Sequence, residues 1–127
     1  MQVYSDNQLV KTYKIALGRN PIGAKEFEGD KKTPEGIFKI NFKSESVSYH
    51  KKLGISYPKK ENIEYAKQFG KSAGGNVLIH GLHKKLKFTG KFHRWKDWTF
   101  GCIALTNNEI DELYKAVEIG TIIEIKP

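Results

Sequence analysis

The alternation of apolar and polar side chains predicts strands in four parts of the chain. Residues 9–17 place apolar side chains mostly at odd positions, which is the two-residue period of a β-strand. Residues 38–42 repeat this pattern directly after a segment rich in turn formers. The short apolar run at residues 77–79 predicts a buried strand that delivers His80 at its end. Residues 121–125 have the β-branched content of a closing strand.

One helix is expected, because four apolar residues fall at the spacing that forms a single helical face. These residues are Ile110, Leu113, Tyr114 and Val117. Thr106 and Glu109 form a capping box at the helix start, and Gly120 supplies its stop. A weaker period over residues 61–69 is given little weight, and residues 44–60 are expected to be the longest irregular stretch.

These elements predict a mainly β domain, a sandwich or partly closed barrel with one helix after Cys102. At 127 residues with 39% hydrophobic side chains, the chain is expected to form a single domain over residues 1–127. No apolar run approaches the length of a transmembrane helix, so a membrane span is not expected. The first residues have neither a basic start nor a hydrophobic run, so no signal peptide is expected in them.

The excess of basic residues indicates which binding partners are favoured. Lys and Arg number 22 against 14 Asp and Glu, giving a formal net charge of +8. Such a field favours anionic partners, including nucleic acid, anionic lipid and acidic glycopolymers.

Cys102 is the single cysteine and cannot form an intramolecular disulfide. A lone cysteine is more often a small buried apolar residue than a nucleophile. His80, at the end of a predicted strand, is a candidate partner because an imidazole favours the reactive thiolate. Gly101 would allow a sharp turn that exposes backbone N–H groups beside the sulfur, as an oxyanion hole requires. Together these features indicate acyl transfer.

The two motifs resemble a known family. Ile79-His80-Gly81 and Thr99-Phe100-Gly101-Cys102-Ile103, with residues 83–98 as the spacer, resemble the YkuD-type L,D-transpeptidase catalytic domain, whose members remodel bacterial peptidoglycan. The turns after residues 17 and 28, the helix after Cys102 and the final strand resemble that domain too, so the resemblance covers nearly the whole chain.

The resemblance implies a role for each motif residue. Cys102 would be the nucleophile, His80 the general base and then acid, and the Gly81 backbone carbonyl would orient the imidazole. Backbone N–H groups of Phe100, Gly101 and Cys102 are candidates for the oxyanion hole. Thr99 and Trp98 are substrate-side candidates.

The resemblance also implies the reaction. Cys102 would form a thioester with a stem tetrapeptide and release D-alanine. The acyl group would pass to an amine of a neighbouring stem, giving a 3-3 cross-link, or to a lipoprotein lysine. Transfer to water would instead make the protein an L,D-carboxypeptidase or amidase. No cofactor or metal is needed, and a periplasmic or otherwise extracytoplasmic location is implied.

Two positions depart from the family pattern. Phe100 stands where the family usually has His, and Ala104 stands where Arg or Asn is common. The upstream His80 survives, so the basic mechanism is retained, while substrate contacts and the choice of acceptor stay open.

Residues 82–98 interleave basic and aromatic side chains, a pattern that also binds single-stranded nucleic acid. The segment could equally be a solvated loop, or a substrate-side loop that meets an anionic cell-wall polymer. We favour the last interpretation and do not expect nucleic acid as a partner. The four histidines lack the spacing of a zinc site, so no metal is expected.

Overall fold

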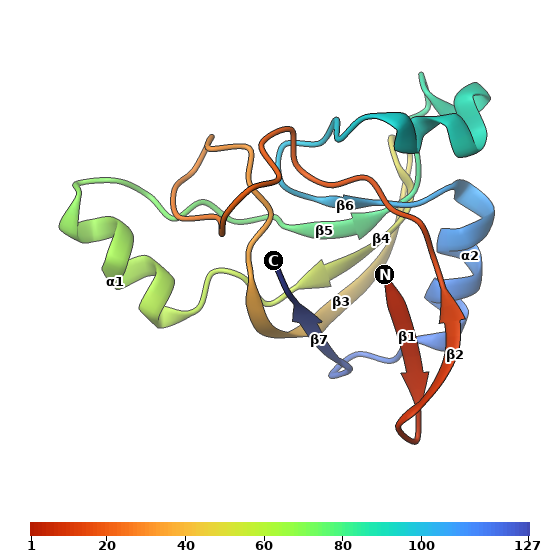
Figure 1. The fold of residues 1–127 in the computed structure, drawn as a ribbon, viewed down its shortest axis with the longest axis horizontal. Helices are drawn as coiled ribbons and strands as arrows, with labels where there is room; N and C mark the ends of the chain where they lie inside the picture. The colour runs from red at the N-terminus through yellow and green to blue at the C-terminus, as the bar shows by residue number, and fades with distance from the viewer.

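The structure, a computed structural model, describes residues 1–127 and contains two sheets (Figure 1). The hairpin β1 (Gln2–Ser5) and β2 (Gln8–Thr12) forms the smaller one. The larger sheet has the order β6-β5-β4-β3-β7. Its strands are β3 (Gly36–Ser46), β4 (His50–Ile55), β5 (Leu78–His80), β6 (Ile103–Ala104) and β7 (Ile122–Ile125).

The long strand β3 organises the larger sheet. Its first four residues pair with β7, and its remainder pairs with β4, so the sheet curls along β3 (Figure 1). All neighbours are antiparallel except β5 and β6, which run parallel. The expectation of a mainly β, partly closed architecture is confirmed.

The expected helix is present as α2 (Asn107–Ala116), and its capping box is formed. Glu109 N–H donates to Thr106 Oγ1 at 3.3 Å, and Thr106 N–H donates to Glu109 Oε2 at 3.0 Å. Ile110 and Leu113 are buried, and α2 packs on β4. The helix ends at Ala116, before the expected stop at Gly120, which instead adopts a φ of +95° in the turn toward β7.

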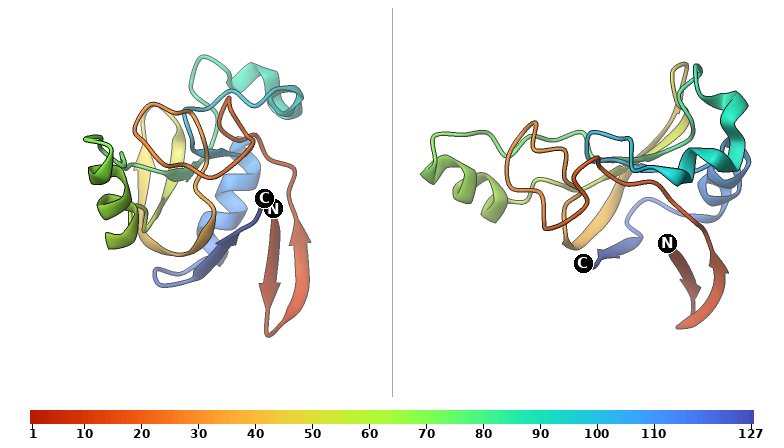
Figure 2. Two further views of the ribbon diagram at one scale, coloured as in Figure 1. Left: turned by 60° about the vertical axis from the view of Figure 1, so that its left-hand side comes forward. Right: turned by 45° about the horizontal axis from the view of Figure 1, so that its top comes forward.

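The expectation of a single helix is wrong, because α1 (Lys60–Gln68) occupies the segment given little weight. Its Ala66 is fully buried, and Tyr65 and the following Phe69 pack against Phe27. These tertiary contacts stabilise a short helix whose own period is weak. A 3₁₀ segment, η1 (Lys87–Trp95), lies near α2, while α1 lies at the opposite end of the molecule (Figure 2). None of these helices has the length and apolar character of a membrane-spanning segment.

Three strand expectations also need correction. The stretch 44–60 is not irregular, because it contains the end of β3, β4 and the start of α1. The strand expected at residues 9–17 ends at Thr12, and among residues 13–17 only Ala16 forms an isolated bridge, to Ala104. Phe42 is 37% exposed although Phe38 and Ile40 are buried, since a register shift between Ile40 and Phe42 breaks the alternation.

Candidate active site

His80 ends β5, between the neighbouring strands β4 and β6, and is only 3% exposed. Its Nδ1 lies 2.5 Å from the Gly81 carbonyl oxygen. A carbonyl can only accept, so Nδ1 carries the proton of this hydrogen bond and the neutral ring keeps Nε2 free as a base.

The Gly81 carbonyl is held in place by its surroundings. Gly81 N–H donates to the Lys51 carbonyl on β4 at 3.1 Å. A Cβ at position 81 would lie 2.7 Å from Asn107 Oδ1 and 2.8 Å from the Tyr49 carbonyl oxygen, so only glycine fits. The same Asn107 oxygen accepts from Leu82 N–H at 2.9 Å, which ties this corner to the start of α2.

Aromatic rings cover the imidazole of His80. The ring centroid of Tyr49 lies 4.5 Å from that of His80, and the ring centroid of Trp98 lies 5.9 Å from it. Burial lowers the pKa of His80 below its ordinary value of 6.5, with His93 and His83 adding to the effect and the Gly81 hydrogen bond opposing it. The imidazole is therefore neutral at neutral pH.

Thr99 to Cys102 form a tight turn that ends at the thiol. The buried Thr99 hydroxyl donates to the Cys102 carbonyl at 2.7 Å and accepts from Gly101 N–H at 3.1 Å. Gly101 has a φ of +132°, and a Cβ there would lie 2.6 Å from the Lys32 carbonyl oxygen. Only glycine meets both conditions, so this residue fixes the backbone beside Cys102.

The Cys102 thiol is half-buried, and its Sγ donates to the Asn76 carbonyl at 3.5 Å. Burial raises the pKa of the thiol, while a Leu78 backbone hydrogen bond and the Lys25 charge act in the opposite direction. The resting group is therefore a protonated thiol that needs a base before it can attack.

The parallel pairing of β5 and β6 brings the two motifs together. His80 lies opposite Ala104, and Cys102 is two residues before Ala104 on the neighbouring chain segment. No hydrogen bond joins Sγ to the imidazole. His80 is the last residue of β5, and Cys102 directly precedes Ile103, which pairs with Ile79, so the two residues lie on adjacent chain segments two register positions apart. Thr99 and Gly101 lie in the Cys102 turn, and Trp98 lies beside His80.

A pocket of about 200 Å³ opens beside the thiol. Three short segments line it: Lys25, Glu28 and Gly29; residues 74–77; and residues 100–102. His80 does not line this pocket, so Cys102 is reached from the pocket side while the imidazole lies under its aromatic cover.

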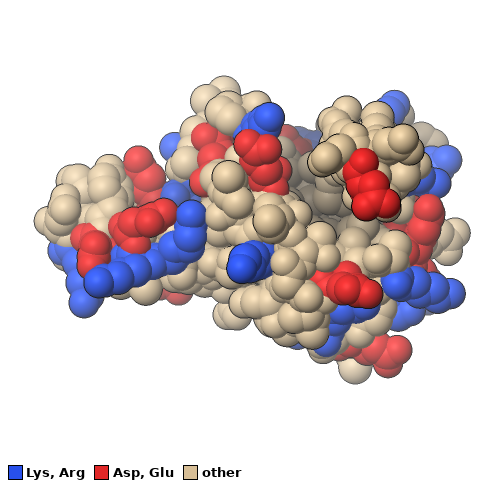
Figure 3. Space-filling model, turned by 90° about the horizontal axis from the view of Figure 1, so that it is seen from below, with Lys and Arg blue, Asp and Glu red and all other residues tan.

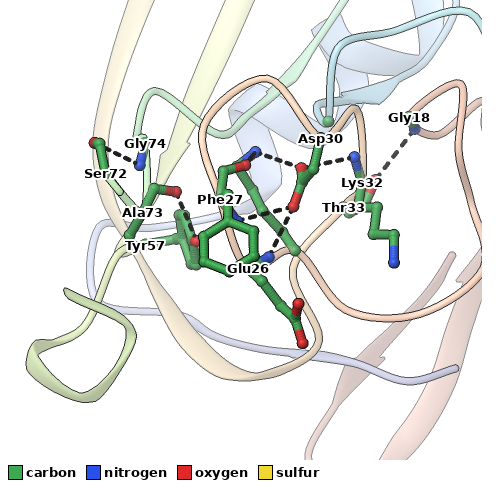
Figure 4. A network of polar contacts seen from close by, with 12 residues as sticks. Gly18, Glu26, Phe27, Asp30, Lys32, Thr33, Tyr57, Ser72, Ala73 and Gly74 are labelled. Carbon is green, nitrogen blue, oxygen red and sulfur yellow. Dashed lines mark hydrogen bonds and ion pairs between the residues drawn. The ribbon is translucent and has the colours of Figure 1, made fainter. Parts of the chain in front are cut away.

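A polar network shapes the first of these segments (Figure 4). Lys25 Nζ donates to Asp30 Oδ1 and to the Phe27 carbonyl, both at 2.9 Å. Asp30 also accepts from the N–H groups of Glu26, Phe27 and Lys32 at 2.8 to 3.1 Å. Burial alone would raise the pKa of Asp30, but these hydrogen bonds outweigh it and lower the pKa. Every side-chain polar atom of the Lys25–Asp30 pair forms a hydrogen bond within this loop.

The expected oxyanion donors differ in availability. Gly101 N–H is already bonded to Thr99 Oγ1, so in this conformation it is not free. The N–H groups of Phe100 and Cys102 donate to no group of the chain. These two donors are the ones that a developing oxyanion beside the thiol could use.

Both departures from the family pattern have a structural setting. Phe100 is 69% exposed, with the Arg19 guanidinium 5.0 Å from its ring centroid. Ala104 is fully buried, and its N–H and C=O pair with Ala16 at 2.9 and 3.1 Å.

Sequence reasoning missed Lys25, Asp30 and Asn76. Asp30 had a readable signal, because a short polar side chain in a turn-rich segment often accepts backbone N–H groups two residues on. No sequence signal marked Lys25 or Asn76, since Lys25 is one of many lysines and Asn76 acts through its backbone carbonyl. The structure contains no group of three or more His, Cys, Asp or Glu arranged to hold a metal ion.

Comparisons with known proteins agree with the family resemblance. Residues 1–125 match the family described as YkuD, L,D-transpeptidase catalytic domain. The chain is 30% identical over 124 residues to a Bacillus subtilis (strain 168) protein named "Putative L,D-transpeptidase YqjB", covering 95% of this chain and 62% of that one. It is 30% identical over 112 residues to "Putative L,D-transpeptidase YafK" of Escherichia coli (strain K12), covering 87% of this chain and 38% of that one.

A solved structure gives the same result. The helical cell shape determining protein Pgp2 of Campylobacter jejuni superposes with a TM-score of 0.70 at 27% identity, covering 98% of this chain and 43% of the Pgp2 chain. The chain thus spans less than two thirds of each of these proteins. A match to the family over residues 1–125 nevertheless takes in every strand and helix described above, and the chain belongs to the L,D-transpeptidase catalytic domain (YkuD) family.

Proposed function

We propose that this domain is a cysteine-dependent L,D-transpeptidase of the bacterial cell wall, with Cys102 as the nucleophile and His80 as the base. The observation that carries the proposal is the pairing of β5 with β6, which places an imidazole with a free Nε2 and a pocket-lining thiol on adjacent segments. Family membership supports peptidoglycan stem peptides as the substrate.

The first half-reaction forms a thioester. His80 Nε2 takes the thiol proton, and Cys102 Sγ attacks the carbonyl carbon of the third residue of a stem tetrapeptide. The N–H groups of Phe100 and Cys102 hold the oxyanion, each contributing about 3–4 kcal/mol in sites of this kind. When the intermediate collapses, the C–N bond breaks, and the amine of D-alanine leaves with the proton from His80.

The second half-reaction returns the thiol. An amine from a neighbouring stem or a lipoprotein lysine attacks the thioester, His80 accepts its proton, and Cys102 leaves as the thiolate and is reprotonated. The products are a new amide and the free enzyme. This chemistry acts outside the cytoplasm, where peptidoglycan lies, which favours an extracytoplasmic location. The name of Pgp2 as a cell shape determining protein is consistent with a role in wall remodelling.

Hydrolysis is the second candidate, and one observation favours it. An amine acceptor approaching from the pocket would pass Phe100, where the Arg19 guanidinium lies 5.0 Å from the ring. A cation at this position repels a protonated amine and leaves water unaffected. The same thioester would then be resolved by water, and the domain would act as an L,D-carboxypeptidase or amidase.

The test uses purified muropeptides with four-residue stems and mass-resolved products. We expect the wild-type protein to release D-alanine, and Cys102→Ala and His80→Ala to lose this activity by about 10³-fold or more. His50→Ala is the matched control, because His50 is exposed and bonds only to Asp111. Cross-linked dimers would identify the transpeptidase, and D-alanine release alone the carboxypeptidase. No product from folded, reduced protein would contradict the proposal.

A further inference from the structure

The 3₁₀ segment η1 exposes three large aromatic side chains close together. Phe88 and Trp95 are each 83% exposed, and Phe92 is 66% exposed. Aromatic side chains of this size normally bury most of their surface, so a local group of exposed ones marks a contact surface. We call η1 together with Lys84, Lys85 and Lys96 the basic aromatic face.

The charge of this face has one sign. Residues 83–96 contain six basic residues and no acidic one. Arg94 is paired with Glu109 of α2, while the five lysines are exposed and form no ion pair. The face seen from below in Figure 3 carries acidic and basic side chains side by side. The unbalanced positive charge around η1, which lies at the top in Figure 1, is therefore complementary to an anionic surface.

The aromatic arrangement discriminates between anionic partners. The rings of Phe92 and Trp95 meet edge to face, with an interplanar angle of 89° and centroids 5.2 Å apart. This pair offers no flat platform of parallel rings on which successive nucleic-acid bases would stack. Phe and Trp at the tip with Lys around them is instead the composition of segments that lie in the headgroup region of a bilayer.

The face is anchored to the domain without blocking the thiol. Arg94, near the end of the segment, bonds to Glu109 of α2, and Lys84 N–H, at its start, donates to the Ser48 carbonyl at 2.8 Å, so both ends of the segment are tied to the body. None of the residues lining the Cys102 pocket belongs to the face. A partner bound here would leave that pocket open.

We propose that the basic aromatic face docks on the surface of an anionic lipid bilayer, with Phe88, Phe92 and Trp95 inserted among the headgroups and the lysines contacting lipid phosphates. The docking holds the domain at the membrane with its thiol pocket accessible. It does not depend on the proposed enzymatic function, so binding and turnover are tested separately.

The test is sedimentation of the purified protein with vesicles of phosphatidylglycerol mixed with phosphatidylcholine. We expect binding to these vesicles, little binding to phosphatidylcholine alone, and release by salt. The double variant Phe92→Ala/Trp95→Ala should bind about tenfold or more weakly, because it removes inserted apolar area and keeps every charge. Tyr4→Ala is the matched control, since Tyr4 is an exposed aromatic on β1. D-alanine release without vesicles should be unchanged in both variants.

Three results would overturn the proposal. One is the absence of binding to the anionic vesicles. Another is binding of the double variant to these vesicles as tightly as the wild type, which would show that the charges attract the protein without insertion of the aromatic side chains. The third is preferential binding to purified sacculi or to single-stranded oligonucleotides in competition with the vesicles, which would assign the face to a polymer. Circular dichroism of the double variant, whose changed side chains are exposed, checks that it is folded.

Discussion

Two loops flank the candidate site, and each is held by one buried ion pair. In residues 18–35 the pair is Lys25–Asp30, with side chains 5% and 15% exposed. In residues 83–98 Arg94 pairs with Glu109, with side chains 14% and 20% exposed. The first pair has every polar atom satisfied within its loop. The second leaves Arg94 Nε without a partner, and the neighbouring His93 Nε2 is also buried and unpartnered.

This difference indicates that residues 18–35 are held rigidly beside the thiol, whereas residues 83–98 are attached more loosely. The Lys25–Asp30 loop presses its Lys32 carbonyl against Gly101 and so determines the backbone beside the thiol. The 83–98 segment is attached through a few contacts near its two ends and exposes the aromatic residues between them. Buried polar groups without partners cost free energy, so displacing residues 83–98 costs less free energy than displacing residues 18–35.

The largest effect is expected at Asp30. Asp30→Ala leaves the buried Lys25 ammonium and three backbone N–H groups without their acceptor, so we expect the free energy of unfolding to fall by about 3–5 kcal/mol. Urea unfolding at neutral pH measures this loss. Glu124→Ala is the control, because its pair with Lys126 is exposed, and it should cost less than about 1 kcal/mol.

The stability lost in Asp30→Ala should depend on pH. The pKa of Asp30 in the folded protein lies below its ordinary value of 3.8, so its stabilising contribution is present above that value and disappears as the pH falls through the folded pKa. The stability difference between wild type and Asp30→Ala should therefore narrow at acid pH. A difference that stayed constant to the lowest pH would show that the carboxylate charge is not the source of stability.

The next effect compares two glycines, one on each side of the site. Gly101→Ala introduces a Cβ 2.6 Å from the Lys32 carbonyl oxygen and should displace the thiol enough to reduce D-alanine release by about 100-fold. Gly90, in η1, also has a positive φ, of +51°, but Gly90→Ala places its added Cβ with nothing within 4 Å. It should keep its activity, at a stability cost of about 1–2 kcal/mol from backbone strain. Equal activity losses would remove the distinction between the two loops.

A smaller effect is expected from Arg94→Met. It removes a hydrogen-bonded ion pair while Glu109 keeps its helix-capping bond to Thr106, so the cost should be about 1.5–3 kcal/mol. Hydrogen exchange should show the loss concentrated in residues 87–95, with the strands still protected. Lys91→Met, on the same segment and exposed, controls for the lost charge. Loss of protection across the whole sheet would mean that this loop is as integral as the other.

The smallest effect concerns the pH profile. Burial under Trp98 and Tyr49 lowers the pKa of His80, so kcat/KM should rise with pH through a value below 6.5. Trp98→Ala admits water to the imidazole and should raise that pKa toward 6.5, moving the acid limb to higher pH. Trp95→Ala, whose ring is exposed, should leave the limb in place. An unmoved limb in Trp98→Ala would exclude the ring as a cause of the shift.

The parts of the fold that could be predicted are those with local signals. The capping box predicts the start of α2, and the apolar run that ends at His80 predicts β5. The positions of His80 and Cys102 come from a motif with defined spacing, while their roles stay predictions. Strand β4 was missed because Lys51 and Lys52 interrupt its apolar pattern, although Leu53 is fully buried. Partners set by folding alone, such as the Asn76 carbonyl at the thiol, leave no trace in residue types.

The parallel pairing of β5 with β6 has a consequence for how such domains diversify. Parallel neighbours cannot be joined by a tight turn, so a crossover must connect His80 to Cys102 whatever its sequence. Selection can therefore rewrite the middle of that connection while the strand register keeps the reacting atoms in place. Exchanging this crossover between family members is a route to new acceptors or new attachment surfaces on an unchanged chemical centre.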